Sequence, residues 1–142
     1  MRFAEYPWTE RRFYWLNEGG SHHFGAARYQ VCRLGIAVPL IGKLYRYSVN
    51  VRMVFALRQK WHLFDLPRDE LFGSFFDAMD AFECPFGNSG LPKNMHDTKK
   101  SGVALKLVWL ERGHPKADAV ADVLSTENFP DFGKLLLKLA VN

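Results

Sequence analysis

The sequence predicts a mixed α/β domain of the α+β kind, in which a small mixed sheet has flanking helices. Some segments repeat apolar residues at helical spacing, whereas others alternate apolar and polar residues as strands do. Hydrophobic residues make up 48% and charged residues 24% of the 142 residues, which is typical of a globular domain and excludes disordered and collagen-like chains. At this length we expect one domain over residues 1–142, with a core of its own.

The first elements are expected to be a strand, a glycine turn and a helix. The aromatic run at residues 13–16 predicts a short buried strand, and Asn-Glu-Gly-Gly at residues 17–20 predicts a tight turn. Apolar residues recur at helical spacing over residues 22–34, and Gly35 follows where a helix commonly ends.

Two apolar stretches after this helix predict strand. Residues 36–41 are β-branched and apolar, and Pro39 makes them an edge or an irregular start of a strand. Residues 43–49 alternate apolar and polar side chains, which is a second strand signal. Strand, turn, helix and strand together form one compact α/β unit.

The second half of the chain predicts a longer series of elements. In chain order we expect a helix over 51–61 (with strand left open), a helix over 67–82, a strand over 103–110, a helix over 115–124 and an apolar closing element over 132–141. Residues 85–102 are rich in Gly, Pro, Asn, Ser and Lys and have no periodicity. They predict a flexible loop that is either disordered or a functional lid.

Positive charge is concentrated in the first part of the chain. Residues 1–60 contain ten Lys+Arg and three Glu, whereas the remainder contains nine Lys+Arg and twelve Asp+Glu. Arginine, which dominates the basic set, suits forked contacts with phosphate, and six aromatic residues between positions 3 and 15 are compatible with base stacking. The stronger interpretation of most of these aromatic residues is that they belong to the core.

The segment at residues 17–28 has the pattern of an anion site. A strand that ends in Gly19 and Gly20 and opens a helix presents backbone N–H groups at the positive end of the helix dipole. Ser21, His22 and His23 add donors at the same place, and histidine can carry charge near neutral pH. Arg33 lies on the same helical stripe as His22. The alternative is a structural turn in which Ser21 is an N-cap and the histidines are solvated.

These residues resemble a known nucleotide-binding motif. Gly19-Gly20-Ser21-His22-His23-Phe24, then Ala26-Ala27, then residues 34–39 (Leu-Gly-Ile-Ala-Val-Pro) look like the motif of the ParB/sulfiredoxin superfamily. They also resemble an uncharacterised bacterial or phage family within it. The resemblance covers residues 13–49. Ser21 stands where the reductases of that superfamily have a reactive Cys, so we do not expect sulfinic acid reduction; His23 stands where Arg is usual.

The resemblance implies a phosphate site with nucleotide chemistry. By it, Glu18, His22 and His23 fall on catalytic positions, and Gly19, Gly20, Ser21, His22, His23 and Arg33 on ligand-binding positions. The implied cofactor is a nucleoside triphosphate, ATP or CTP, with Mg²⁺. The implied reaction is phosphoryl transfer, nucleotide hydrolysis or nuclease cleavage, in which the histidines stabilise charge and Glu18 is the base or a Mg²⁺ ligand.

Two other functions fit the sequence. One is a DNA- or RNA-binding module of a phage or mobile element, which contacts the nucleic-acid backbone with the basic first half. The other is a non-catalytic protein that docks on a protein partner, for example as an inhibitor. We do not expect the protein to bind a membrane, because no stretch of the sequence approaches the roughly 20 consecutive apolar residues of a membrane span. Two cysteines, Cys32 and Cys84, are too few for a disulfide framework, which favours the cytoplasm.

Other polar residues are weaker candidates. His96 and Asp97 lie in the predicted loop and could close over a phosphate, although a mobile, solvated loop is the favoured interpretation. Asp77 and Asp80 share a helical face that could hold Mg²⁺, although an ordinary solvated face is favoured. His114 before Pro115 predicts a helix cap, and Cys84 is expected to be a small buried residue. No Cys/His spacing matches a zinc site.

Overall fold

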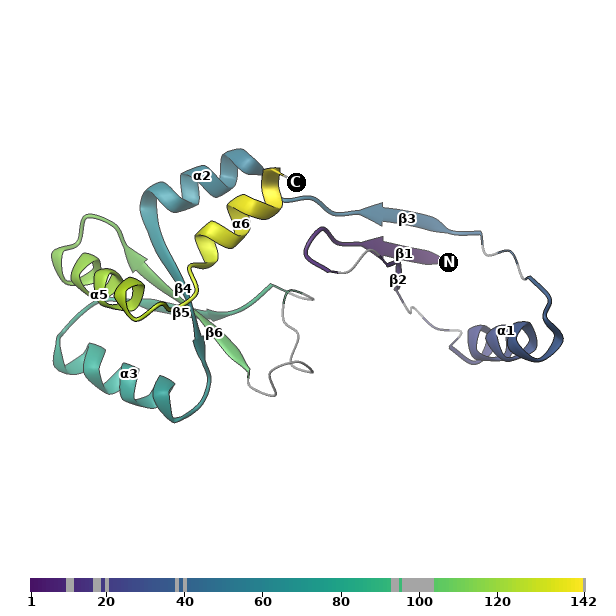
Figure 1. The fold of residues 1–142 in the computed structure, drawn as a ribbon, viewed down its shortest axis with the longest axis horizontal. Helices are drawn as coiled ribbons and strands as arrows, with labels where there is room; N and C mark the ends of the chain where they lie inside the picture. Colours follow the sequence, from purple (N-terminus) through teal and green to yellow (C-terminus); the bar gives the residue numbers. More distant parts are fainter. Residues whose placement is uncertain are drawn as a thin grey trace. The chain divides into compact units, whose positions relative to one another are not determined.

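The structure confirms the mixed α/β class. It is a computed structural model that describes residues 1–9, 12–16, 19, 21–37, 39, 41–92, 95 and 104–141. Over these residues there are five helices and two sheets of three strands each (Figure 1). None of the described helices combines the length and the apolar character that crossing a membrane requires. The contacts of the chain group into two compact units, unit 1 (Met1–Ser48) and unit 2 (Val49–Asn142), so the expected single domain stays a prediction.

Unit 1 contains a mixed sheet and one helix. The strands β1 (Arg2–Glu5), β2 (Tyr14–Trp15) and β3 (Lys43–Arg46) lie in the order β2-β1-β3. β2 is antiparallel to β1, whereas β3 is parallel to it. The helix α1 (Ser21–Leu34) connects β2 to β3, as a parallel partner requires a crossover. Strand, helix and strand therefore follow in the predicted order, and β1 is an addition that the sequence did not reveal.

Local contacts explain the ends of these elements. Gly35 has φ +59°, and its N–H donates to the Val31 carbonyl at 3.0 Å, which is the expected glycine end of α1. At the other end of the connection, a Cβ at Gly42 would lie 2.6 Å from the Met1 carbonyl oxygen, so only glycine lets β3 approach β1. The strand expected over residues 36–41 is wrong for the residues that the structure describes there, because none of residues 36, 37, 39 and 41 belongs to a strand.

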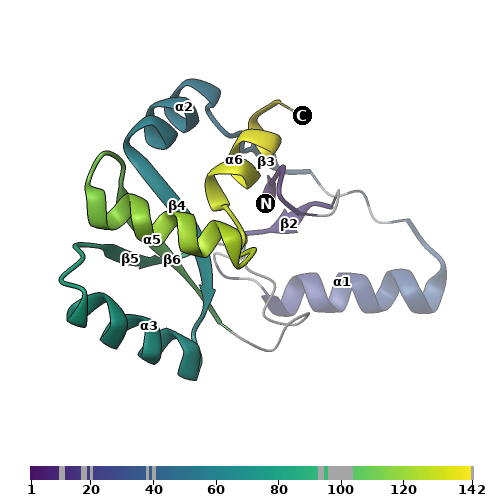
Figure 2. The ribbon, with the colours of Figure 1, turned by 60° about the vertical axis from the view of Figure 1, so that its left-hand side comes forward.

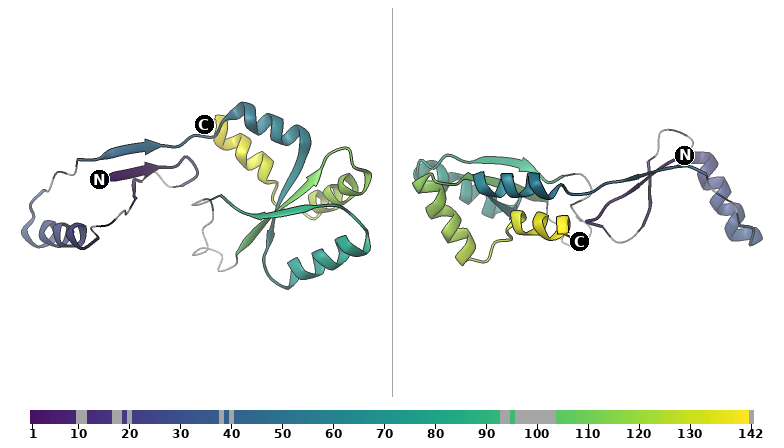
Figure 3. Two further views of the ribbon diagram at one scale, coloured as in Figure 1. Left: turned by 180° about the vertical axis from the view of Figure 1, so that it is seen from behind. Right: turned by 90° about the horizontal axis from the view of Figure 1, so that it is seen from above.

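Unit 2 is a three-layer arrangement around an antiparallel sheet. The strands β4 (Trp61–Pro67), β5 (Gly87–Gly90) and β6 (Leu105–Glu111) lie in the order β4-β6-β5. The helices α3 (Glu70–Ala81) and α5 (Pro115–Thr126) cover one face (Figure 2). The helices α2 (Val51–Lys60) and α6 (Phe132–Val141) lie side by side and cover the other (Figure 3).

The two faces of this sheet form two hydrophobic clusters. Phe64, Leu66, Val108 and Leu110 of the sheet pack with Met79 of α3 and with Ala117, Ala121 and Leu124 of α5. On the opposite face, Leu63 and Leu107 pack with Phe132 of α6 and Leu57 of α2. Unit 1 differs, because Ala4 is its only buried residue among those whose burial the structure describes. The main core of the chain therefore belongs to unit 2.

Two expectations for unit 2 need correction, and one that the sequence left open is settled. Pro67 ends β4 instead of opening a helix, and α3 begins at Glu70 because Asp69 caps it by accepting from the Leu71 N–H at 3.0 Å. The predicted flexible loop over 85–102 contains β5, which pairs with β6. Residues 93–94 and 96–102 of that loop lie outside the described residues. The closing element is a helix, α6.

Candidate functional site

The turn before α1 places a helix N-terminus where the sequence predicted an anion site. Gly19 has φ +107°, a left-handed conformation that favours glycine, and α1 begins at Ser21. The first turn carries His22 and His23, both exposed, and has no acidic residue. The first N–H groups of a helix have no partner within the helix and lie at the positive end of its dipole. The geometry there suits a phosphate or a carboxylate.

The other predicted site residues are only partly placed. Glu18 and Gly20 lie outside the described residues, as do His96, Asp97 and the side chain of Ser21. The assignment of Glu18 as base or Mg²⁺ ligand stays a prediction.

Arg33 lies at the opposite end of the helix from the histidines. It belongs to the last turn of α1, eleven residues after His22, which corresponds to about 16 Å along the helix axis. Its Nε donates to the Tyr29 hydroxyl at 3.0 Å, and its guanidinium lies 5.6 Å from the centre of that ring. A single phosphate group cannot contact both His22 and Arg33, so α1 carries two separate basic ends.

The net positive charge of the protein lies in unit 1. Residues 1–48 contain seven Lys+Arg and three Glu, for a net charge of +4, and residues 49–142 contain twelve of each sign, for a net charge of zero. The formal charge of the whole chain, +4, is therefore the charge of unit 1. A chain in which one unit is positive and the other is neutral attracts polyanions to the positive unit.

The structure also places the weaker candidates for metal binding, thiol chemistry and helix capping. Asp77 and Asp80 are exposed on α3, and the described residues contain no group of three or more His, Cys, Asp or Glu that could hold a metal ion. Cys84 is buried as predicted, and burial raises the pKa of its thiol, which disfavours the nucleophilic thiolate. His114 is confirmed as the N-cap of α5, where its side chain accepts from the Ala117 N–H at 3.4 Å.

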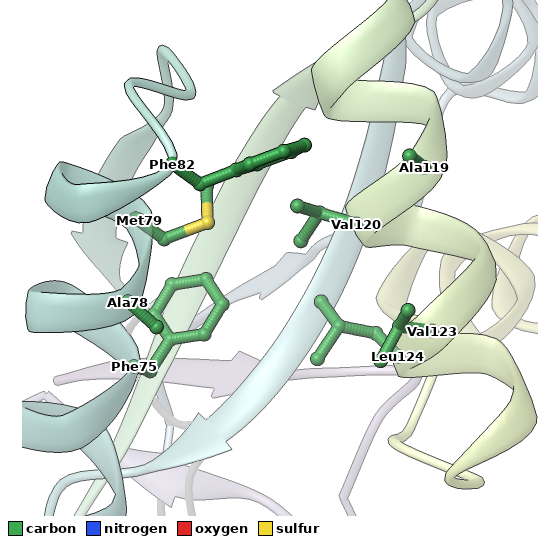
Figure 4. A pocket seen from close by; sticks show the side chains of 8 residues that line it. All are labelled: Phe75, Ala78, Met79, Phe82, Ala119, Val120, Val123 and Leu124. Atoms are coloured by element: carbon green, nitrogen blue, oxygen red, sulfur yellow. The ribbon is translucent and has the colours of Figure 1, made fainter.

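An apolar groove between α3 and α5 was not predicted. Its volume is about 340 Å³, and Figure 4 shows the side chains of the two helices facing one another across it. Phe82 and Val123 are 46% and 60% exposed at this groove. Apolar residues at helical spacing predict a core face, so the sequence offered no signal that part of this face is open.

A buried aspartate and a His–Asp pair of unit 2 were also missed. Asp65 of β4 is buried, and its Oδ1 has no hydrogen-bond partner among the described residues. Burial, together with the nearby charge of Asp131, raises the pKa of Asp65 to about 6. His62 Nε2 lies 2.9 Å from Asp118 Oδ1. The only signal for Asp65 was an acidic residue within an apolar run, and His62 and Asp118 are too far apart in sequence for a motif to join them.

Comparisons with known proteins place the chain in a family without assigning an activity. Neither the curated proteins nor the solved structures gave a match. One family model matches residues 1–142, and its description is a family of unknown function (DUF6685). Because the match spans the whole chain, the protein belongs to this family of unknown function.

Proposed function

We propose that unit 1 binds nucleic acid through its phosphate backbone, with the first turn of α1 as one phosphate contact. The observation that carries the proposal is the charge of α1. This helix has no acidic residue, and its ionisable side chains other than Tyr29 and Cys32 are His22, His23, Arg28 and Arg33. All four are exposed, and the two histidines lie at the positive end of the helix dipole.

The spacing of these side chains favours a polymer of phosphates over a single phosphate group. His22 and Arg33 are separated by about 16 Å along the helix axis. One strand of a duplex carries a phosphate about every 3.4 Å along its axis, so several phosphates fall within that length. A nucleic acid can therefore contact both ends of α1 at once.

The test is binding of a labelled DNA duplex and a labelled RNA strand over a salt series. Neutralising phosphates releases counterions, so affinity should fall by orders of magnitude between about 50 and 200 mM salt. Each phosphate contact removed should reduce the magnitude of the slope of log affinity against log salt by about 0.7–0.9. We expect Arg28→Ala and Arg33→Ala to lower it, and His22→Ala with His23→Ala to weaken binding.

Gln30→Ala is the matched control, because Gln30 is an exposed, uncharged residue on the same helix. It should leave both affinity and salt slope unchanged. A flat salt response of the wild-type protein, or equal losses in the Gln30 and Arg variants, would contradict the proposal.

A mononucleotide is the second candidate ligand, favoured by the compact first turn of α1 after Gly19. The ParB/sulfiredoxin resemblance adds ATP or CTP with Mg²⁺, and phosphoryl transfer or hydrolysis as the reaction. A nucleotide at about a hundred times its dissociation constant stabilises the protein by about 2.7 kcal/mol. Thermal shifts with each nucleotide, with and without Mg²⁺, should then disappear in His22→Ala. Turnover that is lost in Glu18→Gln, with binding retained, would support catalysis.

A further inference from the structure

We propose that one face of the sheet in unit 1 stacks the bases of an unpaired strand, so that the nucleic acid is single-stranded. This face, the tyrosine face, is defined by Tyr6, Tyr14, Tyr45 and Tyr47. The inference rests on the proposed function, in that unit 1 must bind nucleic acid. It adds the class of nucleic acid and a binding surface made of rings, separate from the first turn of α1.

The strand register brings the tyrosines together. Ala4 of β1 pairs with Tyr14 of β2 and with Tyr45 of β3. Residues directly opposite one another share a face of a sheet, so Tyr14 and Tyr45 flank Ala4 on one face. Tyr6 and Tyr47 follow two residues after Ala4 and Tyr45, and the Tyr47 N–H donates to the Glu5 carbonyl at 3.0 Å, which continues the pairing of β1 and β3 (Figure 1).

Ring contacts of Tyr6 join it to Tyr14 and Tyr47 on this face, whereas Tyr45 is placed there by the strand register. The ring of Tyr6 stacks on Tyr47 with centroids 4.9 Å apart and an angle of 20°, and it meets Tyr14 edge to face at 5.4 Å. Trp8 packs against Tyr6 at 5.2 Å. Tyr45 and Tyr47 are 40% and 48% exposed. Rings that are held by neighbours and half open to solvent lose little freedom when a base stacks on them.

The charges around the tyrosine face are complementary to phosphate. Arg2 pairs with Lys43, two residues before Ala4 and Tyr45 on the same strands. Because alternate residues of a strand share a face, both cations lie on the tyrosine face. The row between these two pairs, Phe3 with Leu44, lies on the opposite face.

A third cation lies beside the rings, and the acidic residue of the sheet lies away from them. The guanidinium of Arg12 is 5.0 Å from the centre of the Tyr14 ring, and its Nε donates to the Tyr14 hydroxyl at 2.9 Å. Glu5 is the only acidic residue among the described residues of unit 1. It is in register with Arg46 on the other face, where the two side chains form an ion pair at 2.9 Å. The tyrosine face is therefore basic.

Rings beside cations on an open sheet suit unpaired bases. In a duplex the bases stack on one another and their faces are closed to the protein, whereas an unpaired strand can lay its bases on aromatic rings and its phosphates on nearby cations. Stacking on one aromatic ring changes affinity by about 5- to 150-fold per base. The tyrosine face offers two half-exposed rings, Tyr45 and Tyr47, at alternate positions along one strand of chain.

The experiment compares labelled oligo(dT), oligo(U) and a DNA duplex of the same length by fluorescence anisotropy. We expect the wild-type protein to bind a single strand more tightly than the duplex. Tyr45→Leu and Tyr47→Leu, which keep apolar bulk and remove the ring, should each weaken single-strand binding by about 5- to 150-fold. Tyr45→Phe and Tyr47→Phe keep the ring and should stay close to wild type. Phe55→Leu, at an exposed aromatic residue of unit 2, is the control outside unit 1.

The outcomes separate this inference from the proposed function. Equal affinity for single strand and duplex, with no effect of the Leu variants, would overturn the tyrosine face and leave nucleic-acid binding standing. No binding of any oligonucleotide would overturn both. Should the Leu variants fail to fold, photocrosslinking of wild-type protein to a bromouridine-containing strand decides the question. Crosslinks at Tyr45 or Tyr47 support the inference, and crosslinks found only elsewhere overturn it.

Discussion

His62 on β4 and Asp118 on α5 are joined by a contact of 2.9 Å between Nε2 and Oδ1. The same carboxylate accepts from the Gly113 N–H at 3.0 Å, so it links the strand, the β6–α5 turn and the first turn of the helix. The hydrogen bond with His62, and less strongly the one with Gly113, lowers the pKa of Asp118 from its ordinary value of 3.8. The carboxylate form is therefore favoured by folding.

We expect Asp118→Asn to lower the melting temperature at neutral pH. A depressed pKa in the folded state contributes stability above the unfolded value of 3.8, and this contribution is lost as the pH falls through the lower folded value. The difference between wild type and variant should therefore narrow in acid. Thermal unfolding over a pH series measures it, with Asp122→Asn, an exposed aspartate on the same helix, as the control. A gap that widens in acid would contradict the linkage.

For Asp65 we expect the opposite effect, a gain in stability at neutral pH when the carboxylate is removed. Its pKa is raised from 3.8 to about 6, by burial first and by the charge of Asp131 second. Below pH 3.8 the carboxyl is protonated in both states and costs nothing; the cost of ionising it in the fold grows up to about pH 6 and is complete above. Asp65→Asn should therefore raise the free energy of unfolding at neutral pH by about 1–3 kcal/mol.

Denaturant unfolding at several pH values tests the effect of Asp65. The gain in Asp65→Asn should disappear as the pH falls toward 3.8, where the wild-type side chain is neutral as well. Asp80→Asn, at an exposed position of α3, should change little at any pH. A variant that is less stable than wild type at neutral pH would show that the buried carboxylate is compensated by interactions that the asparagine cannot make.

The core of unit 2 allows us to predict how much the free energy of unfolding falls when a buried or an exposed side chain is shortened. Leu110 is fully buried between β4, α3 and α5, so Leu110→Ala should lower the free energy of unfolding by about 2–5 kcal/mol through lost burial and a cavity. Val123 lies on α5 but is 60% exposed, and Val123→Ala should cost less than about 1 kcal/mol. Urea unfolding followed by circular dichroism compares the two, and equal losses would mean that the groove between α3 and α5 is closed in solution.

The helices were predictable because their signals are local. The spacing of Phe24, Ala27 and Val31, followed by Gly35, gave α1, and His114 before Pro115 gave the start of α5. The strands β2, β3 and β6 also lie where apolar or alternating residues predicted strands, whereas β4 and β5 were not predicted. β5 is Gly-Asn-Ser-Gly, a sequence typical of a loop, and it is a strand because β6 lies beside it. β4 was missed because Asp65 interrupts its apolar pattern and Pro67 resembles a helix start.

The candidate sites divide in the same way. Gly19, His22 and His23 are neighbours in sequence, so the N-terminal turn of α1 could be predicted from residue types alone. The tyrosine face could not, because it requires β3 to pair in parallel with β1, and a single sequence does not specify which strands pair or in which register. Contacts such as His62 with Asp118, separated by 56 positions, depend on the finished fold.

The pairing of β1 with β3 makes the last prediction. A Cβ at Gly42 would lie 2.6 Å from the Met1 carbonyl oxygen and 2.7 Å from Cε2 of Phe3. The Met1 carbonyl also accepts the Lys43 N–H at 2.9 Å, so the backbone there cannot shift without losing that bond. We expect Gly42→Ala to destabilise unit 1 by about 1–3 kcal/mol and to separate β3 from β1.

Amide hydrogen exchange of residues 43–47 measures this pairing directly, since their protection depends on β1. Gly25→Ala is the matched control: Gly25 lies within α1, and a Cβ there has nothing within 4 Å. Alanine should stabilise that helix by about 0.5–1 kcal/mol, because glycine loses more backbone freedom on folding. Two results together would contradict this prediction: unchanged exchange of residues 43–47 in Gly42→Ala, and loss of single-strand binding in the same variant. The tyrosine face could then not depend on the parallel pairing of β1 with β3.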